Sequence, residues 1–290
     1  KTVNINPSVA YQLTDTLSVG AGISAQYAKA RLTSAIDFGV VCFTQLNPAA
    51  CAGAGVVPQT ADGVVDIEGD DWSFGWNAGL AWTPHPDWRI GLHYRSAIDQ
   101  NLEGSADFTV SANAAFLTAT GAFANTGARA GLTLPASTEL GVRWQANDRT
   151  TLYANAQWTE WSSIRELRVR FANPVQSDSA DALNYDDAGR YGIGADYRLT
   201  NQWSVRAGYA RDKSPAKSAY RTARIPDNDR DILAFGATWT PNEAWSLDAG
   251  YNRVTIKDTD FSRTGSFADA VTGLYSGNAD VISVGARRRF

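Results

Sequence analysis

The residues that could carry covalent chemistry are few and poorly placed for it. Nucleophilic catalysis needs a hydroxyl or thiol with a base beside it, and the chain has only 2 histidines. His85 stands between two prolines in a turn, and His93 falls on the polar face of a strand-like segment beside Arg89 and Arg95. We therefore expect a protein that is not an enzyme.

Residues that could bind a metal or carry redox chemistry are equally few. Cys42 and Cys51 have no histidine near them, which leaves too few ligands for a structural zinc site. A disulfide formed in an oxidising compartment is the prediction, and two free thiols are the alternative. The charged cluster at 227–231 predicts an ion-pair network, with a bound cation as the alternative. We expect no metal and no cofactor.

Charge and hydropathy exclude two further classes of protein. The net charge is -4, and the lysines and arginines are dispersed along the chain, so a nucleic-acid partner is not expected. No stretch approaches the roughly 18 uncharged apolar residues that a transmembrane helix needs. A helical membrane protein is therefore excluded.

The sequence pattern predicts that long strands position these residues. An alternating strand, a short polar turn and a second alternating strand recur along the chain, with turns at 13–18, 83–88, 145–150, 199–203 and 240–245. Within 72–82 the even positions are apolar, and the odd positions are mostly glycine, serine and asparagine. Tryptophans on the apolar face stand at strand ends beside the turns, where the aromatic girdle of a membrane barrel lies. The pattern predicts a transmembrane antiparallel β-barrel with its apolar face in lipid, and a soluble β-sandwich is the alternative.

The strand count suggests that part of the barrel is absent. The hairpins and the final alternating segment give about eleven strands, whereas bacterial barrels normally have an even number. The chain also begins at Lys1 without a start methionine or a signal sequence. We expect residues 1–290 to form one outer-membrane barrel domain that is the C-terminal part of a larger barrel. The longer connections, at roughly 31–69, 105–131, 172–184, 213–229 and 259–277, are expected at the extracellular end.

Several motifs together resemble those of the FadL family of outer-membrane transporters for hydrophobic compounds, which includes the TodX-type aromatic hydrocarbon channels. They are "WSFGWNAG" (72–79), "YRS" (94–96), "LTLP" (132–135), "WTEWSSIREL" (158–167), "DKSP" (212–215) and "IPDNDR" (225–230). The resemblance implies a barrel of about fourteen strands plugged by an N-terminal hatch, so the hatch and the first strands are expected to lie outside this chain. It also implies passive uptake of a hydrophobic ligand, in the first place a long-chain fatty acid, with lateral release into the membrane. An aromatic or alkane hydrocarbon is the alternative ligand. An unspecific porin and an adhesin or phage-receptor barrel are more distant alternatives.

The resemblance also points to the residues that could bind the ligand. In the family, two extracellular loops capture the ligand, and the matching loops here are 31–69 and 105–131. Their apolar side chains are either a capture surface or loop-on-loop packing, and both interpretations stay open. The candidates are Phe38, Val41, Phe43, Leu46, Phe116, Leu117 and Phe123.

Charge recognition departs from the family pattern. The positions at which fatty-acid transporters are expected to carry two basic residues are Ser34 and Asp181 in this chain. Lys29, Arg31 and Arg190 lie close enough in sequence to substitute for them. An uncharged ligand is therefore more plausible here than the family alone suggests.

The last residue resembles an assembly signal. Phe290 matches the C-terminal aromatic residue that the barrel-assembly machinery recognises in outer-membrane barrels. Besides this machinery and the ligand, we expect outer-membrane lipid and lipopolysaccharide as partners. We expect the protein to be a monomer in the outer membrane of a Gram-negative bacterium.

Overall fold

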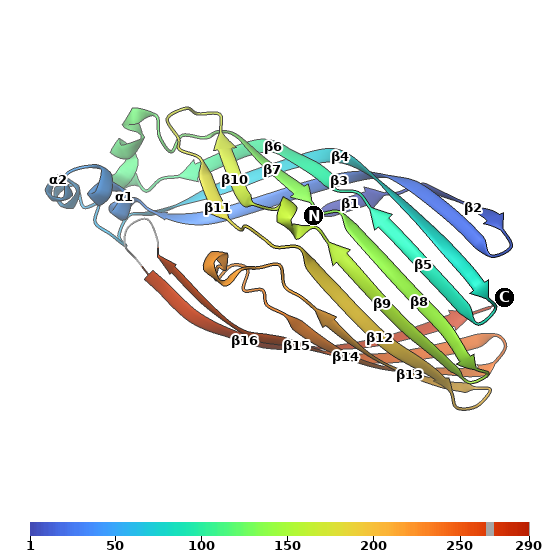
Figure 1. Cartoon of the computed structure of the whole chain (residues 1–290). Helices are drawn as coiled ribbons and strands as arrows, with labels where there is room; N and C mark the ends of the chain where they lie inside the picture. Colours follow the sequence, from blue (N-terminus) through green and yellow to red (C-terminus); the bar gives the residue numbers. More distant parts are fainter. Residues whose placement is uncertain (265–269, 290) are drawn as a thin grey trace.

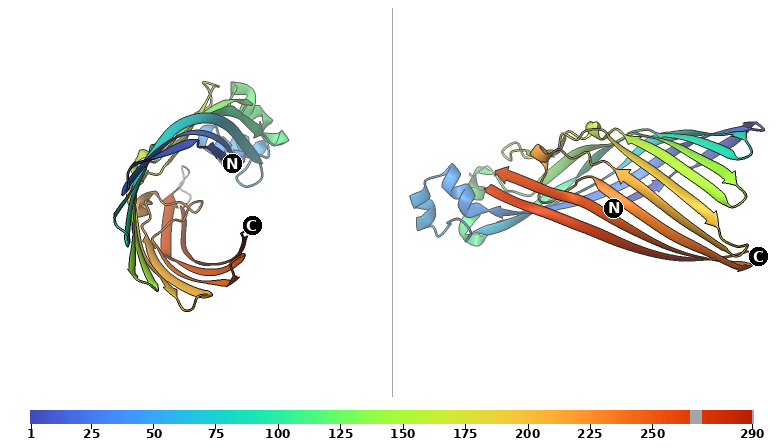
Figure 2. Two further views of the ribbon diagram at one scale, coloured as in Figure 1. Left: turned by 90° about the vertical axis from the view of Figure 1, so that its right-hand side faces the viewer. Right: turned by 60° about the horizontal axis from the view of Figure 1, so that its bottom comes forward.

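A single antiparallel sheet curls into an open barrel. The computed structural model describes residues 1–264 and 270–289, and 16 strand segments join in this sheet. Figure 1 shows the short turns at one end and the helices and long loops at the other, and Figure 2 shows the sheet as an arc when viewed end-on. The predicted all-β membrane-barrel architecture is confirmed.

The strands and helices have the following bounds. The strands are β1 (Thr2–Ile5), β2 (Ser8–Thr14), β3 (Leu17–Asp37), β4 (Asp62–His85), β5 (Trp88–Arg95), β6 (Ile98–Thr109), β7 (Thr126–Leu134), β8 (Ser137–Asn147), β9 (Thr150–Thr159), β10 (Glu166–Phe171), β11 (Ser179–Ala182), β12 (Ala188–Arg198), β13 (Trp203–Asp212), β14 (Arg230–Asn242), β15 (Trp245–Thr264) and β16 (Ala270–Arg288). The helical segments are α1 (Phe38–Gln45), α2 (Pro48–Gly53) and the short 3-10 helices η1 (Ala112–Thr120), η2 (Trp161–Ser163) and η3 (Ser218–Tyr220).

These segments form eleven barrel strands, because five of the strands are broken in two. The broken strands are β1 with β2, β5 with β6, β7 with β8, β9 with β10, and β11 with β12. Two of the breaks fall at Pro7 and Pro135, which have no backbone N–H to donate to a neighbouring strand. The predicted number of strands is therefore confirmed.

The register places apolar side chains on the outer face. β3 pairs with β4 from Leu17 opposite Trp82 to Asp37 opposite Asp62, which puts the odd residues of β3 and the even residues of β4 on one side. That side is strongly exposed, for example 70% at Phe74. At the short-turn end, Trp88 stacks on Trp144 with ring centroids 5.2 Å apart, and Trp203 and Trp239 stack at 5.8 Å. Contact between such a face and lipid hydrocarbon costs little free energy, whereas its exposure to water is unfavourable.

Several strands run further toward the loops than the sequence pattern predicts. The predicted loop 31–69 is reduced to 38–61, because β3 continues to Asp37 and β4 begins at Asp62. Residues added to the two strands form ion pairs on the outer face, as Arg31 does with Asp66 at 2.9 Å. Beyond the hydrocarbon layer the outer face of a strand does not have to be apolar, and here the polarity of the two faces is reversed, with Leu32 on the inner face and Arg31 on the outer face.

A small apolar cluster holds the longest loops together over the end of the barrel. We call this part, formed by α1, α2 and η1, the loop cap. Its buried residues are Phe38, Val41, Cys42, Cys51, Val56, Ala61, Ala114 and Leu117. The carboxylate of Asp37 caps α1 by accepting from the backbone N–H of Val40 at 3.0 Å. Gly39 is needed here, because an added Cβ would lie 2.0 Å from the carbonyl oxygen of Val57. Within the described residues, no helix is long and apolar enough to cross a membrane.

Candidate ligand-binding site

The inner face of the sheet changes character toward the long loops. Near the short turns the inner residues of β3 are small or polar, as at Ser18 and Gly20, whereas Leu32 and Ile36 occupy the same face near the loops. The register continues this apolar character across the neighbouring strands, because Leu32 lies opposite Ile67 and Ile67 lies opposite Ala106. We call the resulting surface the apolar lumen patch. It consists of Leu32, Ile36, Val65, Ile67, Ala106, Phe108, Ala128, Ala130, Val169 and Phe171.

A cavity of about 370 Å³ lies against this patch, and we call it the loop-end pocket. Phe123 and Gln176 contribute to its lining from the loops, and Ser34, Ser179 and Asp181 contribute polar groups from the strands. The ring of Phe123 lies edge-on to the ring of Phe38 at 5.0 Å and to that of Phe108 at 6.0 Å. Phe123 therefore joins the loop cap to the apolar lumen patch.

Two arginines that sequence analysis missed lie beside Asp181 of this pocket. Arg224, from the connection between β13 and β14, lines the pocket and lies 3.5 Å from a carboxylate oxygen of Asp181. Arg263, near the end of β15, lies 3.9 Å from the other oxygen of that carboxylate. Ser34 and Asp181 thus share a pocket, as their alignment with the family positions implies. The positive charge that these two positions lack is supplied by Arg224 and Arg263, from other parts of the chain.

The connection that carries Arg224 is held by ion pairs. Asp229 accepts from Arg211 and Lys213 at 3.1 Å each, and Lys257 lies 3.4 Å away. Burial by itself would raise the pKa of Asp229, but the hydrogen bond from the backbone of Ser214 and the Lys213 ammonium outweigh it and lower the pKa to about 2. The structure thus places an ion-pair network in the cluster at 227–231.

The predicted loop residues divide into buried and exposed sets. Phe38, Val41 and Leu117 are at most 8% exposed inside the loop cap, and Phe43 packs against it. These four side chains hold the loops to one another. Leu46 and Phe116 are 52% and 43% exposed, so they remain available to a ligand that approaches from outside. A disulfide joins Cys42 to Cys51 within the loop cap, and the two Cα atoms lie 6.0 Å apart.

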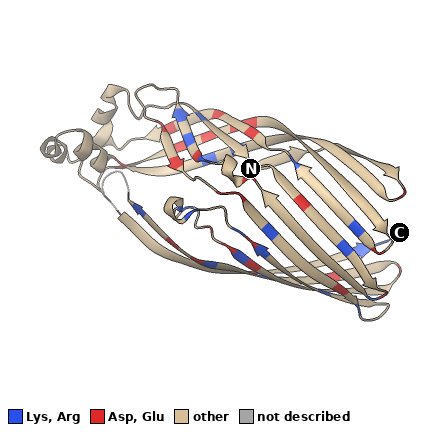
Figure 3. Ribbon diagram, viewed as in Figure 1, with Lys and Arg blue, Asp and Glu red and all other residues tan. Residues whose placement is uncertain are grey.

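The predicted basic residues do not come together. Lys29 pairs with Glu68, and the Nε of Arg31 donates to Asp66 at 2.9 Å. Both basic residues belong to the odd positions of β3, which lie on the outer face with Tyr27. They therefore point away from the lumen, and we no longer assign them to a ligand inside the barrel. Figure 3 shows the charged residues gathered toward the long-loop end of β3, β4, β6 and β10.

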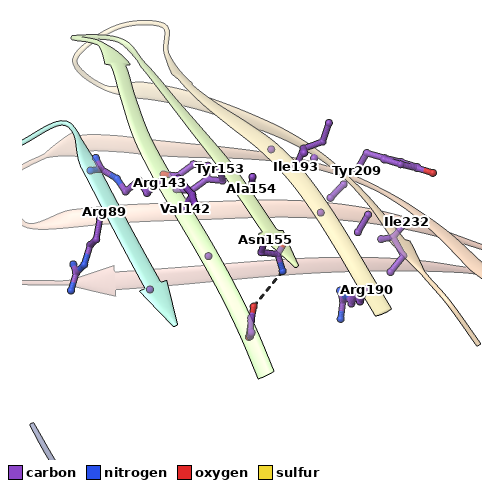
Figure 4. A pocket seen from close by; sticks show the side chains of 18 of the residues that line it. Arg89, Val142, Arg143, Tyr153, Ala154, Asn155, Arg190, Ile193, Tyr209 and Ile232 are labelled. Carbon is purple, nitrogen blue, oxygen red and sulfur yellow. Dashed lines mark hydrogen bonds between the residues drawn. The ribbon is translucent and has the colours of Figure 1, made fainter. Parts of the chain in front are cut away.

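Arg190 belongs to a second hollow on the inner face, which lies outside the loop-end pocket. This hollow, which we call the arginine hollow, has a volume of about 570 Å³ and is lined by Arg89, Arg143, Arg190, Glu139 and Asn155. Figure 4 shows Arg89 and Arg143 toward one side of it, Arg190 toward the other and Asn155 between them. Phe290, the predicted assembly signal, lies outside the described residues.

Comparison with known proteins identifies the family over the full chain. A family model described as "Outer membrane protein transport protein (OMPP1/FadL/TodX)" matches residues 1–290. The chain is 32% identical over 261 residues to a long-chain fatty acid transport protein of Salmonella typhi, a match that covers 86% of this chain and 58% of that protein. It is 30% identical over 289 residues to outer membrane protein P1 of Haemophilus influenzae, covering 93% of this chain and 59% of that protein. The chain therefore spans less than two thirds of the length of these relatives.

Solved structures give the same fold. A Pseudomonas aeruginosa FadL homologue superposes with a TM-score of 0.83 at 25% identity, covering 99% of this chain and 67% of that chain. The Ralstonia pickettii toluene transporter TbuX superposes at 0.61 with 20% identity, over 99% of this chain and 67% of that chain, and shows the fold alone. The chain lies in the outer membrane and belongs to the FadL/TodX family of outer membrane transport proteins.

Proposed function

We propose that this chain is the barrel part of an outer-membrane channel for the passive uptake of hydrophobic compounds, with long-chain fatty acids as its substrate. The observation that carries the proposal is the loop-end pocket, which presents an apolar wall on one side and Arg224, beside Asp181, on the other. An acyl chain gains free energy by leaving water for such a wall. A guanidinium group binds a carboxylate through two parallel hydrogen bonds.

The charges at the pocket favour an acid over a neutral ligand. Arg224 and Arg263 share the single carboxylate of Asp181, so the three groups carry a formal charge of about +1. The Arg224 side chain is 64% exposed, which leaves donors free for a second carboxylate. The relatives with 30 to 32% identity include several named as long-chain fatty acid transport proteins, which supports the same substrate class.

The transport step that we propose is a partition between three environments. Exposed apolar residues of the loop cap, such as Leu46 and Phe116, capture the ligand from water, and the loop-end pocket then receives its acyl chain. The ligand leaves sideways into the bilayer, whose hydrocarbon interior favours the chain again. We further propose that the protein works as a monomer, that lipopolysaccharide covers its charged outer rim, and that Phe290 guides the barrel-assembly machinery.

A neutral hydrocarbon is the second candidate substrate. The observation in its favour is that Asp181 places a negative charge in the pocket and already engages both arginines. A channel for arenes or alkanes would need the apolar lumen patch and would gain nothing from Arg224. The two candidates therefore differ in what the arginines contribute.

Uptake of labelled oleate separates these candidates. Cells that lack their own transporter would carry the complete gene, either unchanged or as Arg224→Gln with Arg263→Gln, and toluene or an alkane would serve as the competitor. Fatty-acid transport predicts saturable oleate uptake that the double variant reduces about tenfold. Entry of hydrocarbon without oleate uptake would overturn the fatty-acid proposal in favour of the second candidate. Free entry of small hydrophilic solutes at rates set by their size would instead indicate a porin.

A further inference from the structure

The arginine hollow exists because its floor has almost no side chains. Gly91 lies directly opposite Gly141, Asn155 lies opposite both Gly141 and Gly192, and Gly194 lies opposite Gly208. Alanines at 210 and 234 complete the floor. An added Cβ at Gly141 would meet no atom within 4 Å, so the space in front of it is open. A row of small residues on the inner face of β5, β8, β12 and β13 thus leaves a recess in the barrel wall.

Three arginines surround this recess. Arg143 donates to the neutral side chain of Gln145 at 2.6 Å. Arg190 lies opposite Asp212, whose carboxylate is 4.0 Å from Arg230. Arg89 and Arg143 are directly opposed in the register, an arrangement of like charges that disfavours the sheet. Among the salt bridges of the described residues, none involves Arg89, Arg143 or Arg190. Among the described residues that line the hollow, Glu139 alone carries a carboxylate, and it accepts from Asn155 at 3.3 Å. The lining therefore carries a formal excess of about two positive charges.

Arg206, another arginine on the inner face, has acidic partners and serves for comparison. Arg206 lies 3.6 Å from Asp196 and 3.6 Å from Asp248, so two carboxylates neutralise it. No comparable pair of acids accompanies Arg89 or Arg143 in the part of the chain that the structure describes. A recess with uncompensated guanidinium groups is suited to an anion that arrives from outside the wall.

We propose that the arginine hollow is a transit site for the carboxylate of the ligand, separate from the loop-end pocket, and this inference rests on the proposed function. Arg89, Arg143 and Arg190 hold the carboxylate, and the small residues of the floor leave room for the start of its chain. Tyr153 and Ile232 line the same hollow and provide apolar contact. A neutral hydrocarbon gains nothing from these guanidinium groups. The site is therefore selective for monocarboxylates with an apolar chain.

The test uses the complete protein and compares oleate with toluene. Arg89→Gln with Arg143→Gln should lower oleate uptake about tenfold, because two charge-assisted hydrogen bonds to the carboxylate are lost. Toluene uptake should change less than twofold. Arg89→Lys with Arg143→Lys, which keeps the charges, should recover most of the oleate rate. Oleate affinity of the purified double Gln variant should fall less than its uptake rate, because the loop-end pocket is intact.

A second pair of variants tests the space rather than the charge. Gly141→Leu fills the hollow, whereas Gly277→Leu places the same side chain on the inner face of β16, where an added Cβ also meets no atom within 4 Å. Gly141→Leu should slow oleate uptake, and Gly277→Leu should not. Both proteins should show the heat-modifiable band of a folded barrel on a gel.

Three results would overturn the inference. The first is an equal loss of oleate and toluene uptake in the double Gln variant, which would mean that the arginines support the barrel rather than the ligand. The second is a wild-type rate of oleate uptake in that variant. The third is a loss of the folded band in Gly141→Leu alone, which would mean that another part of the protein fills the hollow. Failure of the proposed function has a different signature, because the wild-type protein would then take up no oleate at all.

Discussion

The loop-end pocket and the arginine hollow lie on the same inner face of one sheet, yet they have opposite chemistry. Leucine, isoleucine, valine and phenylalanine line the first, with Asp181 and its two arginines on one side. Glycine, alanine and asparagine line the second, with Arg89, Arg143 and Arg190 around them. Four barrel strands are broken between these levels, namely β5 from β6, β7 from β8, β9 from β10, and β11 from β12. The difference in side chains therefore coincides with a break in the strands that carry them.

This difference suggests how a channel could move an amphiphile without an energy source. The apolar lumen patch favours the acyl chain, and the arginine hollow favours the carboxylate. Each region binds only one part of the ligand, so neither binds the whole ligand tightly enough to prevent its release. The following predictions test this separation, beginning with the change that should have the largest effect.

Placing a charge in the apolar lumen patch should weaken ligand binding most. In Val169→Asp an ionised carboxylate would replace a side chain that is 4% exposed, and its burial without a partner is costly. We expect affinity for oleate to fall about a hundredfold. Displacement of a fluorescent fatty acid from the purified full-length protein measures the affinity. Val175→Asp, at a loop valine that is 52% exposed, is the matched control, and normal binding by Val169→Asp would remove the patch from the ligand path.

Removing the acid from the pocket should strengthen binding of fatty acids. Asp181 occupies donors of Arg224 and Arg263, so Asp181→Asn should free them and raise the affinity for oleate about fivefold. The affinity for an alkane should stay the same, because an alkane makes no use of these donors. Asp178→Asn is the control, since Asp178 does not line the pocket and its carboxylate lies 3.4 Å from the guanidinium group of Arg168. A weaker affinity for oleate in Asp181→Asn would mean that Asp181 positions the arginines rather than competing for them.

Sequence analysis could predict the faces of the strands because lipid imposes a strict period of two. In β4, Trp72 and Phe74 face outward and Ser73 faces inward, as the alternation indicates. The eleven strands follow from the same period and from the polar turns. Outside the hydrocarbon layer this constraint ends, so the extension of β3 through Lys29 and Arg31 was not visible, and the outward direction of those two side chains was missed with it.

The binding groups could be predicted only where they belong to a local pattern. Phe38 and Phe123 stand out as apolar residues in loops, but only the fold shows that the first is buried in the loop cap and the second lines a pocket. Arg224 and Arg263 meet Asp181 from distant parts of the chain, and no local pattern in the sequence indicates that contact. The arginine hollow likewise depends on the register, which aligns glycines of separate strands.

Loss of the disulfide should have a moderate effect that is confined to the loop cap. Cys42 and Cys51 are 0% and 1% exposed, and their link closes a short loop within the cap. Replacing both with serine should weaken the cap by about 2 to 3 kcal/mol, and affinity for oleate should fall by about a factor of three because Phe38 no longer supports Phe123 as firmly. Proteolysis of the segment 38–61 should become faster. Equal cleavage rates in the variant and the wild type would show that the apolar cluster alone holds the cap.

The smallest effect should come from acid, and it should reach the connection 213–229 beside the loop-end pocket. Asp229 has a pKa of about 2 in the folded protein, below the value of about 3.9 for a free aspartate. Its contribution to the order of the connection 213–229 is therefore fully present above about pH 4 and is lost as the pH falls toward 2. The shift corresponds to about 2 to 3 kcal/mol.

A spin label at Ala219, an exposed position in η3, would report the mobility of this connection. We expect constant mobility from pH 8 to pH 5, since both the folded and the free carboxyl are ionised there, and an increase between about pH 4 and pH 2. Asp229→Asn should be mobile already at pH 7, because Lys213 and Arg211 lose their anionic partner. If the label moves equally in both proteins at pH 7, the ion pairs do not hold the connection. Arg224 would then reach Asp181 by the packing of the loop alone.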